Sequence, residues 1–283
     1  MMNYADFRTQ QESFLSSDGA IRYIDKGKGA VILLLHGVPS SSWLYRDFID
    51  PISAAGYRVV APDMLGFGNS ESPKGYELYS GEAHARRLLE LMDHLGVEHW
   101  THVLHDAGGL WTWELFKQAP KRISKLMLFN CILLESGFHP PVRMEPGLMA
   151  KFSLWMYRRS ATVGIILGSL FKKGLQHKKL NWRELEGYKR PLLEGKTAAL
   201  YYFFTRTCLG LPDYRAVLKD INIPLRLIWG KNDPMLVWED QAAEVKSLLK
   251  LSPDQITILD SSHFIQEDNT DFLAQEVLSF ASE

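Results

Sequence analysis

The chain has 283 residues, of which 46% are hydrophobic and 23% are charged, as in an ordinary soluble globular protein that can bury a full core. A formal net charge of −1 gives no electrostatic basis for binding nucleic acid, and two cysteines, Cys131 and Cys208, are too few for a disulfide framework or a zinc cluster. The N-terminus has no apolar signal core, and the longest apolar run, residues 161–171, is well short of the roughly 20 residues that span a bilayer. We therefore expect a cytoplasmic protein without a membrane span.

Strand and helix patterns alternate along most of the chain. The expected strands are two short ones within 12–25, followed by 30–35, 57–61, 101–106, 125–129, 224–230 and 256–259. The expected helices carry apolar residues at helical spacing and lie near 43–49, 81–95, 108–118 and 239–249, with a last one from residue 272. This order predicts an α/β fold with a mostly parallel central sheet and helices on both faces.

Residues 135–214 interrupt this alternation. The stretch is helical in pattern and rich in aromatic residues, methionine and lysine. We therefore expect one α/β core domain, made of residues 1–134 and 215–283, and a helical cap (lid) domain of residues 135–214 inserted between two strands of the sheet.

The stretch from Thr101 to Gly109 places an aspartate at a sharp turn. A β-branched and apolar run ends in His-Asp-Ala-Gly-Gly and a helical pattern begins at once, which is the order of a nucleophile elbow. Asp106 holds the position of the nucleophile, and a carboxylate with a reference pKa of about 3.9 is ionised at pH 7 without the help of a base. The alternative role for Asp106 is a helix N-cap, since aspartate is favoured there.

Two further polar residues follow the ends of later strands. Asp233 comes after the strand at 224–230, and His263 comes after the strand at 256–259. Because ligands of parallel sheets bind at the carboxyl ends of the strands, we expect both residues near Asp106. Taken singly, Asp233 fits a turn and His263 fits a loop, but nucleophile, acid and histidine follow in the order of α/β-hydrolase triads.

Five motifs of the core carry a family resemblance. They are His36-Gly-Val-Pro, Asp63-Met-Leu-Gly-Phe-Gly-Asn-Ser, His105-Asp-Ala-Gly-Gly, Trp229-Gly-Lys-Asn-Asp and Ser262-His-Phe-Ile-Gln-Glu-Asp. With them the chain resembles α/β-hydrolases of the epoxide hydrolase and haloalkane dehalogenase group. The resemblance implies the α/β-hydrolase fold, with Asp106 as nucleophile, His263 as the base that activates water and Asp233 as the acid that orients His263. It also implies an oxyanion hole from the backbone N–H groups of Val38 and Ala107, and no metal or organic cofactor.

An aspartate nucleophile restricts the chemistry. Attack on an ester carbonyl would give an anhydride and is readily reversed, whereas displacement at a saturated carbon gives a stable alkyl ester of Asp106. Water activated by His263 would then hydrolyse this ester. The leading hypothesis is an epoxide hydrolase that gives vicinal diols, acting on a small apolar organic substrate and water.

The leaving group separates the two families. Haloalkane dehalogenases have a Trp directly after the nucleophile and an Asn or Trp nearby, but this chain has Ala107 after the nucleophile and Val38 at the variable position of the His-Gly loop. Epoxide hydrolases use lid tyrosines as proton donors. The sequence around Tyr202 resembles their motif, and Tyr157 is our choice for the second tyrosine.

Two other functions stay open on the sequence. One is a haloalkane dehalogenase with atypical halide donors from the cap, Trp155 or Trp182. The other is a non-catalytic small-molecule receptor on the same fold, because Leu104 and Ser262 replace glycines that are usual in the family. The oligomeric state is also open, and a homodimer is compatible with the sequence.

The remaining assignments concern the walls of the site. We expect the substrate to contact His36, Trp43, Trp155 and Tyr201. Glu135 follows a strand end and is the fallback for the triad acid. His105 precedes the nucleophile, so we expect it to face away from Asp106 and to have a packing role.

Overall fold

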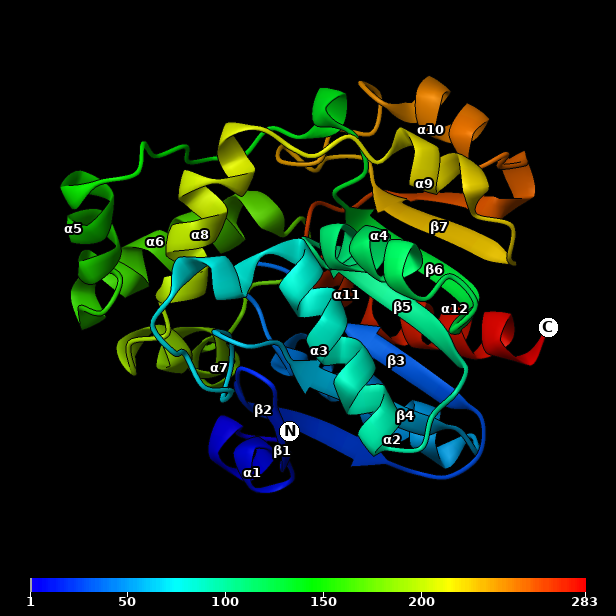
Figure 1. Ribbon diagram of the computed structural model, residues 1–283, viewed down its shortest axis with the longest axis horizontal. Helices are drawn as coiled ribbons and strands as arrows, with labels where there is room; N and C mark the ends of the chain where they lie inside the picture. The colour runs from blue at the N-terminus through cyan, green and yellow to red at the C-terminus, as the bar shows by residue number, and fades with distance from the viewer. Residues whose placement is uncertain (1) are drawn as a thin grey trace.

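A mixed sheet organises the molecule (Figure 1). The structure is a computed structural model that describes residues 2–283, and within them eight strands follow the order β1-β2-β4-β3-β5-β6-β7-β8. The strands are β1 (Glu12–Ser16), β2 (Gly19–Lys26), β3 (Val31–Leu35), β4 (Arg58–Asp63), β5 (Trp100–Asp106), β6 (Ile123–Cys131), β7 (Leu225–Gly230) and β8 (Ile256–Leu259). Pairing is antiparallel for β1 with β2 and β2 with β4, and parallel from β4 through β8. The predicted mostly parallel sheet is confirmed.

Helices cover both faces of the sheet. In Figure 1, α3 and α4 lie on the near face and α12 lies behind, where it packs with α2. The core helices are α1 (Tyr4–Thr9), α2 (Arg46–Ala54), α3 (Gly81–His94), α4 (Gly108–Gln118), α9 (Arg215–Asp220), α10 (Ala242–Leu248), α11 (Ile265–Asp268) and α12 (Thr270–Ser282). Short 3₁₀ helices lie at Ser42–Tyr45, Tyr76–Tyr79, Glu135–Gly137, Thr207–Leu209 and Pro253–Gln255. Because β5 has helices on both sides, every one of its residues is buried, which fixes the strand that ends at Asp106.

The chain between β6 and β7 is helical, as its sequence pattern predicts. Its longer helices are α5 (Leu148–Met156), α6 (Ser160–Gly174), α7 (Trp182–Leu193) and α8 (Ala198–Thr205). We call residues 135–214 the helical segment. Figure 1 shows α5, α6 and α8 together at the left of the molecule, beside one edge of the sheet rather than on its faces.

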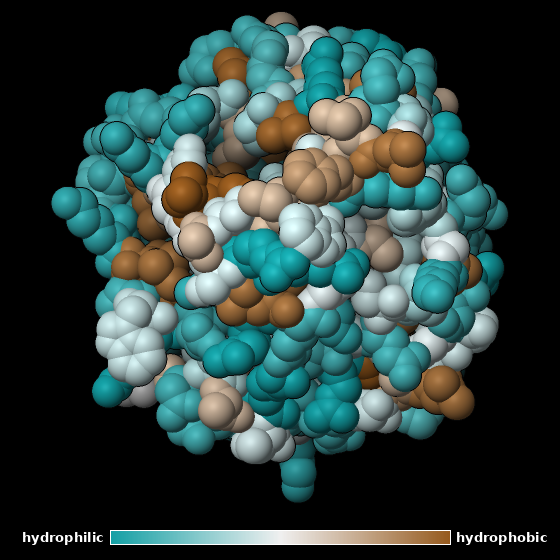
Figure 2. All heavy atoms as spheres, turned by 90° about the vertical axis from the view of Figure 1, so that its left-hand side faces the viewer, coloured by the Kyte–Doolittle hydropathy of each residue, from teal (hydrophilic) through white to brown (hydrophobic). Residues whose placement is uncertain are grey.

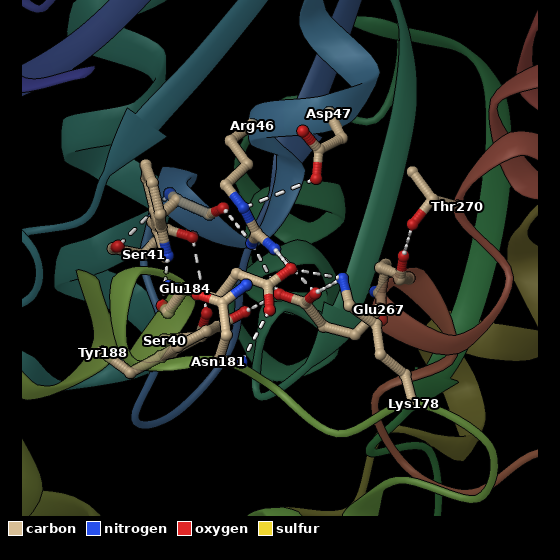
Figure 3. A network of polar contacts seen from close by, with 12 residues as sticks. Ser40, Ser41, Arg46, Asp47, Lys178, Asn181, Glu184, Tyr188, Glu267 and Thr270 are labelled. Carbon is tan, nitrogen blue, oxygen red and sulfur yellow. Dashed lines mark hydrogen bonds and ion pairs between the residues drawn. The ribbon is translucent and has the colours of Figure 1, made fainter. Parts of the chain in front are cut away.

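A buried ionic network attaches the helical segment to the core (Figure 3). Arg46 of α2 donates two hydrogen bonds to Glu267 of α11, with 2.7 Å between Nη2 and Oε2. Tyr188 and Lys178 of the helical segment donate to the same carboxylate at 2.6 and 2.9 Å. Because Glu267 follows His263 closely in the chain, this network holds the helical segment beside the loop that carries the histidine.

The outer face of the helical segment exposes apolar side chains. Figure 2 shows hydrophobic residues around a hollow on this side of the molecule. Leu148, Met149 and Phe152 of α5 and Ile165 of α6 are among the exposed large hydrophobic residues. Within residues 2–283, none of the helices has both the length and the apolar character needed to cross a bilayer.

Candidate active site

Asp106 forms the corner between β5 and α4. Its φ of 51° lies in the left-handed region, which costs a non-glycine residue about 1–2 kcal/mol. The register between β5 and β6 shifts at the same point, and the carbonyl of Asp106 accepts the N–H of Ile132 at 3.0 Å. The N-cap position of α4 belongs to Ala107, which has no capping side chain, so Asp106 is not the cap of this helix.

Two glycines allow the chain to pass close to this corner. A Cβ added to Gly37 would overlap the carboxylate of Asp106 and lie 2.8 Å from the backbone nitrogen of Ala107. A Cβ added to Gly108 would lie 2.9 Å from the carbonyl oxygen of His36. Real Cβ atoms do not approach other atoms this closely, so the His-Gly loop and the start of α4 can meet only because both positions are glycine.

Backbone N–H groups hold the carboxylate of Asp106. The N–H of Val38 donates to Oδ2 at 2.7 Å, and the N–H of Ala107 also stabilises the charged form. Burial raises the pKa of Asp106 above its ordinary value, although these N–H groups and the nearby His263 act to lower it. The carboxylate is therefore poorly hydrated, with one oxygen fixed by the backbone.

Asp233 orients His263. The Oδ2 atom of Asp233 accepts from Nδ1 of His263 at 2.8 Å and from Nδ2 of Asn130 at 2.7 Å. Its Oδ1 atom accepts the backbone N–H groups of Met235 and Leu236 at 2.8 and 3.1 Å. Both oxygens thus have two donors each, so the carboxylate cannot rotate without losing hydrogen bonds, and the proton of neutral His263 stays on Nδ1.

The other nitrogen of His263 faces Asp106. Its Nε2 atom lies 3.9 Å from Oδ1 of Asp106, which is too long for a direct hydrogen bond and leaves Nε2 able to accept a proton from water. Burial acts to lower the pKa of His263, but the charges of Asp233 and Asp106 outweigh it and the pKa is raised overall. The arrangement pairs a carboxylate with an imidazole that can act as a base.

Hydrogen bonds from His105 and Ser262 hold the loop that carries His263. His105 donates from Nε2 to the carbonyl of His263 at 3.0 Å, and the two rings lie 4.6 Å apart, so His105 positions this loop. Ser262 donates to the carbonyls of Lys173 and Asn232 at 2.7 and 3.2 Å. The residues that stand where the family usually has glycine, Leu104 and Ser262, are thus accommodated: Leu104 pairs within the sheet and the corner at Asp106 still forms.

A pocket of about 160 Å³ opens beside Val38, between the core and the helical segment. Its walls come from α3, α4, α8 and the chain that follows α8. The lining residues are Val38, Phe67, Tyr79, Gly81, His84, Leu110, Trp111, Ala199, Tyr202, Phe203, Arg206, Thr207, Gly210, Pro212 and Tyr214. Because Val38 also binds the Asp106 carboxylate, the pocket adjoins the candidate nucleophile.

The structure separates the predicted tyrosines. Tyr202 is half-buried and lines the pocket. Tyr157, at the end of α5, packs against Phe204 with 6.4 Å between ring centroids and is not part of the pocket wall. Tyr201 stacks on Tyr76 at 4.1 Å and its hydroxyl accepts a backbone N–H, so it has a packing role. Of the three, only Tyr202 meets the expectation of a tyrosine beside the site.

Besides Tyr201, three other residues that were expected to contact substrate do not line the pocket. His36 uses both ring nitrogens, donating from Nδ1 to Gly37 at 2.7 Å and accepting the Met64 N–H on Nε2 at 2.9 Å. Trp43 is buried and donates its N–H to the carbonyl of Glu184 at 2.9 Å. Trp155 is 43% exposed and stacks on its helix neighbour Phe152. The first two hold loops and helices together, and the third faces solvent.

The fallback residues also lie elsewhere. Trp182 is 73% exposed, so its N–H does not point at the Asp106 carboxylate. Glu135 accepts the backbone N–H of Leu211 at 2.8 Å instead of bonding His263. Sequence reasoning missed Asn130, which donates to Asp233, and the pocket residues His84 and Trp111. Asn130 is the penultimate residue of β6, which pairs with β7, so its place near a strand end is a signal that the sequence offered. His84 and Trp111 lie within helical patterns and have no such signal.

Comparisons with known proteins identify the family of the chain. A family model described as alpha/beta hydrolase fold matches residues 30–270. The chain is 30% identical over 258 residues to haloalkane dehalogenase 1 of Mycobacterium bovis, covering 88% of this chain and 83% of that protein. It is 29% identical over 275 residues to the haloalkane dehalogenase of Mycolicibacterium paratuberculosis, covering 92% and 87%. Among solved structures, an epoxide hydrolase from Vigna radiata has the same fold, with a TM-score of 0.75 at 18% identity over 96% of this chain and 97% of that chain. Because the family model matches most of the chain and the sheet has the strand order described above, the chain belongs to the α/β-hydrolase family.

Proposed function

We propose that the protein hydrolyses epoxides to vicinal diols through an alkyl ester of Asp106. The observation that carries the proposal is the arrangement of three side chains: Asp106 at a strand-to-helix corner, His263 with Nε2 3.9 Å from its Oδ1, and Asp233 bonded to Nδ1 of that histidine. The similarity to proteins named haloalkane dehalogenase and epoxide hydrolase supports the same class of chemistry.

In the first step, Oδ1 of Asp106 attacks a saturated ring carbon of the epoxide. Oδ2 is bound to the Val38 N–H at 2.7 Å, so Oδ1 is the freer oxygen for the attack. The new bond joins Oδ1 to carbon, the C–O bond of the ring breaks, and the ring oxygen takes the electron pair and then a proton. Burial of Asp106 favours this step, because a poorly hydrated carboxylate is a stronger nucleophile.

In the second step, water attacks the carboxyl carbon of Asp106. His263 accepts the proton of this water on Nε2, and Asp233 stabilises the imidazolium that forms. The negative charge develops on Oδ2, which accepts the N–H of Val38, and the N–H of Ala107 also stabilises the charged carboxyl group. Loss of such a donor costs about 3 kcal/mol of transition-state stabilisation in other hydrolases. The bond between the carboxyl carbon and Oδ1 then breaks, and Oδ1 leaves with the diol after taking the proton from Nε2 of His263. The oxygen from water completes the restored carboxylate of Asp106.

Tyr202 is our candidate for the acid that protonates the ring oxygen. It lines the pocket beside Val38, and among residues 2–283 its hydroxyl has no side-chain hydrogen-bond partner. Burial raises the pKa of Tyr202 above its ordinary value of 10.0, so the hydroxyl keeps its proton at neutral pH. Tyr157 is not beside this pocket, so the proposal assigns it no role in proton donation.

Dehalogenation is the second candidate, and the identity to proteins named haloalkane dehalogenase favours it. The first step would then release a halide ion, whereas the alkoxide from an opened epoxide stays on the alkyl group of the ester. Ala107 and Val38 have no side-chain N–H to bind that halide. The two functions share the Asp106 ester, and they differ only in what leaves.

The test is to trap the ester. His263→Gln should react with styrene-type or aliphatic oxides and gain the mass of one epoxide, while the wild type forms the diol. His139→Gln is the matched control, since His139 is exposed and far from Asp106 in the chain. A single turnover of the wild type in ¹⁸O-water should place the label in Asp106, because water attacks its carboxyl carbon.

Three outcomes decide between the functions. An adduct on Asp106 with epoxides, absent in Asp106→Asn/His263→Gln, supports epoxide hydrolysis. Halide release from alkyl halides without diol formation assigns the second candidate. An intact mass without adduct for either class, in a folded His263→Gln protein, refutes the Asp106 ester altogether and favours a non-catalytic receptor.

A further inference from the structure

Two side chains with ring N–H groups line the pocket, and both belong to helices of the core. His84 of α3 and Trp111 of α4 both line it, and their rings lie 4.6 Å apart. Both side chains are more than nine-tenths buried. Neither belongs to the triad or to the oxyanion hole, so the reaction described above gives them no task.

Arg87 fixes the tautomer of His84. The Nη2 atom of Arg87 lies 3.1 Å from Nδ1 of His84, and a guanidinium can only donate, so Nδ1 is the acceptor. A neutral imidazole that accepts on Nδ1 carries its proton on Nε2. Burial and the charge of Arg87 lower the pKa of His84 well below its ordinary value, which keeps the ring neutral. Asp18 and the carbonyl of Leu78 in turn hold Arg87, each at 2.7 Å.

The two N–H groups have no partner within the described chain. Some buried polar atoms of the described chain lack a partner and are sealed from solvent, but Nε2 of His84 and Nε1 of Trp111 do not belong to this group. Both nitrogens therefore keep some accessible surface, and both side chains line the pocket. In the helix α4, Trp111 lies one turn after Ala107, and helical side chains lean toward the N-terminus of their helix. The indole therefore extends toward the Asp106 end of α4.

The other polar side chains of the pocket are hydroxyls and one guanidinium, so none of them supplies a negatively charged acceptor. Arg206 stands at its wall, and the hydroxyls of Tyr79 and Tyr214 are already donated to Pro73 and Glu114. Among residues 2–283, those that line the pocket include no carboxylate. A buried donor without an acceptor costs free energy, so this wall suits a ligand that brings an acceptor.

We propose that Trp111 and His84 form a donor subsite that binds an electron-rich, hydrogen-bond-accepting group of the substrate, one that is anionic or becomes so. This inference rests on the proposed function, because it names the class of substrate that the Asp106 reaction takes. The volume of about 160 Å³ is close to that of an engineered cavity of about 150 Å³ that admits benzene. The part of the substrate that enters this pocket is thus about the size of a small ring, with an acceptor at the end nearest α4.

Two sources supply such a group, and two probes separate them. Bromide represents an atom that leaves as an anion, and acetate represents a carboxylate that stays on the substrate. Tetramethylammonium, which cannot accept a hydrogen bond, is the negative probe. Binding is measured by calorimetry and by tryptophan emission on the full chain, without turnover.

The variants remove one donor at a time. Trp111→Phe keeps an aromatic ring and loses the N–H, and His84→Phe does the same at the second position. Each should weaken binding of the favoured anion about tenfold or more, as expected for a hydrogen bond to a charged acceptor. His84→Gln, which retains an amide donor, should recover part of the affinity. Trp182→Phe is the matched control, since that indole is exposed and outside the pocket.

The results separate the subsite from the proposed function. Bromide binding that is lost in Trp111→Phe supports a leaving-atom subsite, and acetate binding with the same loss supports a subsite for a substrate carboxylate. Equal affinity in the wild type and in folded Trp111→Phe and His84→Phe proteins, or no anion binding at all, overturns the subsite. The Asp106 adduct in His263→Gln is measured independently, so its presence with a failed anion test refutes only this inference.

Discussion

The ionic network between the helical segment and the core gives a stability prediction of defined size. Arg46→Met removes the guanidinium that donates twice to Glu267 and leaves that carboxylate buried (Figure 3). Glu267 keeps Lys178 at 2.9 Å and Tyr188 at 2.6 Å. Methionine is chosen because it fills much of the same space without a charge.

The expected cost follows from what stays behind. Breaking a buried ion pair from one side typically costs 3–5 kcal/mol, because an uncompensated charge remains in the interior. Since Lys178 still neutralises part of the charge of Glu267, we expect the lower end, about 3 kcal/mol. With an unfolding entropy of about 2.1 cal/mol/K per residue, this corresponds to a fall in Tm of about 5 °C for a chain of this length.

Urea and thermal unfolding of matched variants test the reasoning. Lys26→Met breaks an exposed pair with Asp50 at the same 2.7 Å and should cost less than about 1 kcal/mol. Arg46→Met/Glu267→Met should recover most of the loss, because Lys178 and Glu184 still pair at 2.8 Å. If Arg46→Met costs no more than Lys26→Met, or if the double variant is less stable than the single one, the network does not act as a buried ion pair.

Three further predictions concern the site. Gly37→Ala places a methyl group against the Asp106 carboxylate and should lower the rate of adduct formation at least about 100-fold. Gly164→Ala is the control, because its added methyl group meets open space and should leave this rate unchanged. Stopped-flow product assays measure both variants. Asp233→Asn places an amide against N–H donors and should slow ester hydrolysis by about 10³–10⁴-fold, seen as accumulated adduct in the intact mass. Hydrolysis of the ester needs neutral His263, so its single-turnover rate should fall as pH drops through the pKa of His263, which the carboxylate of Asp233 acts to raise. In Asp233→Asn, which lacks this carboxylate, the inflection should move to lower pH, and an unmoved inflection would contradict the assignment.

The parts of the site that the sequence predicted are those that lie at strand ends. Asp106, Asp233 and His263 each follow a parallel strand, and the carboxyl ends of parallel strands meet at one edge of a sheet. The sequence pattern that predicts a buried parallel strand therefore also predicts that the last residue of the strand lies at this edge of the sheet, near the ends of the neighbouring strands. The glycines at 37 and 108 follow from the same constraint, because two chain segments must pass side by side at that edge.

The walls of the site were not predictable in the same way. A helix pattern indicates the apolar face of a helix but not which of its turns meets the core, so the sequence predicts Tyr157 and Trp155 at the site, whereas both lie outside the pocket. His36 shows a second limit. Its place in the His-Gly loop suggested substrate contact, but the loop itself consumes both ring nitrogens.

The pattern of donors around Asp106 explains why the leaving group cannot be assigned from the nucleophile alone. Val38 and Ala107 offer only backbone N–H groups, and both serve the carboxylate. Stabilisation of a departing oxygen or halide must then come from the pocket wall, where Tyr202, His84, Trp111 and Arg206 carry side-chain donors. A tyrosine hydroxyl can transfer its proton to an alkoxide, whereas an indole or a neutral imidazole can only share a hydrogen bond with a stable anion. Tyr202→Phe should therefore abolish epoxide opening and leave bromide affinity intact, while Trp111→Phe should do the reverse; if one variant removed both, the two donors would act on the same atom.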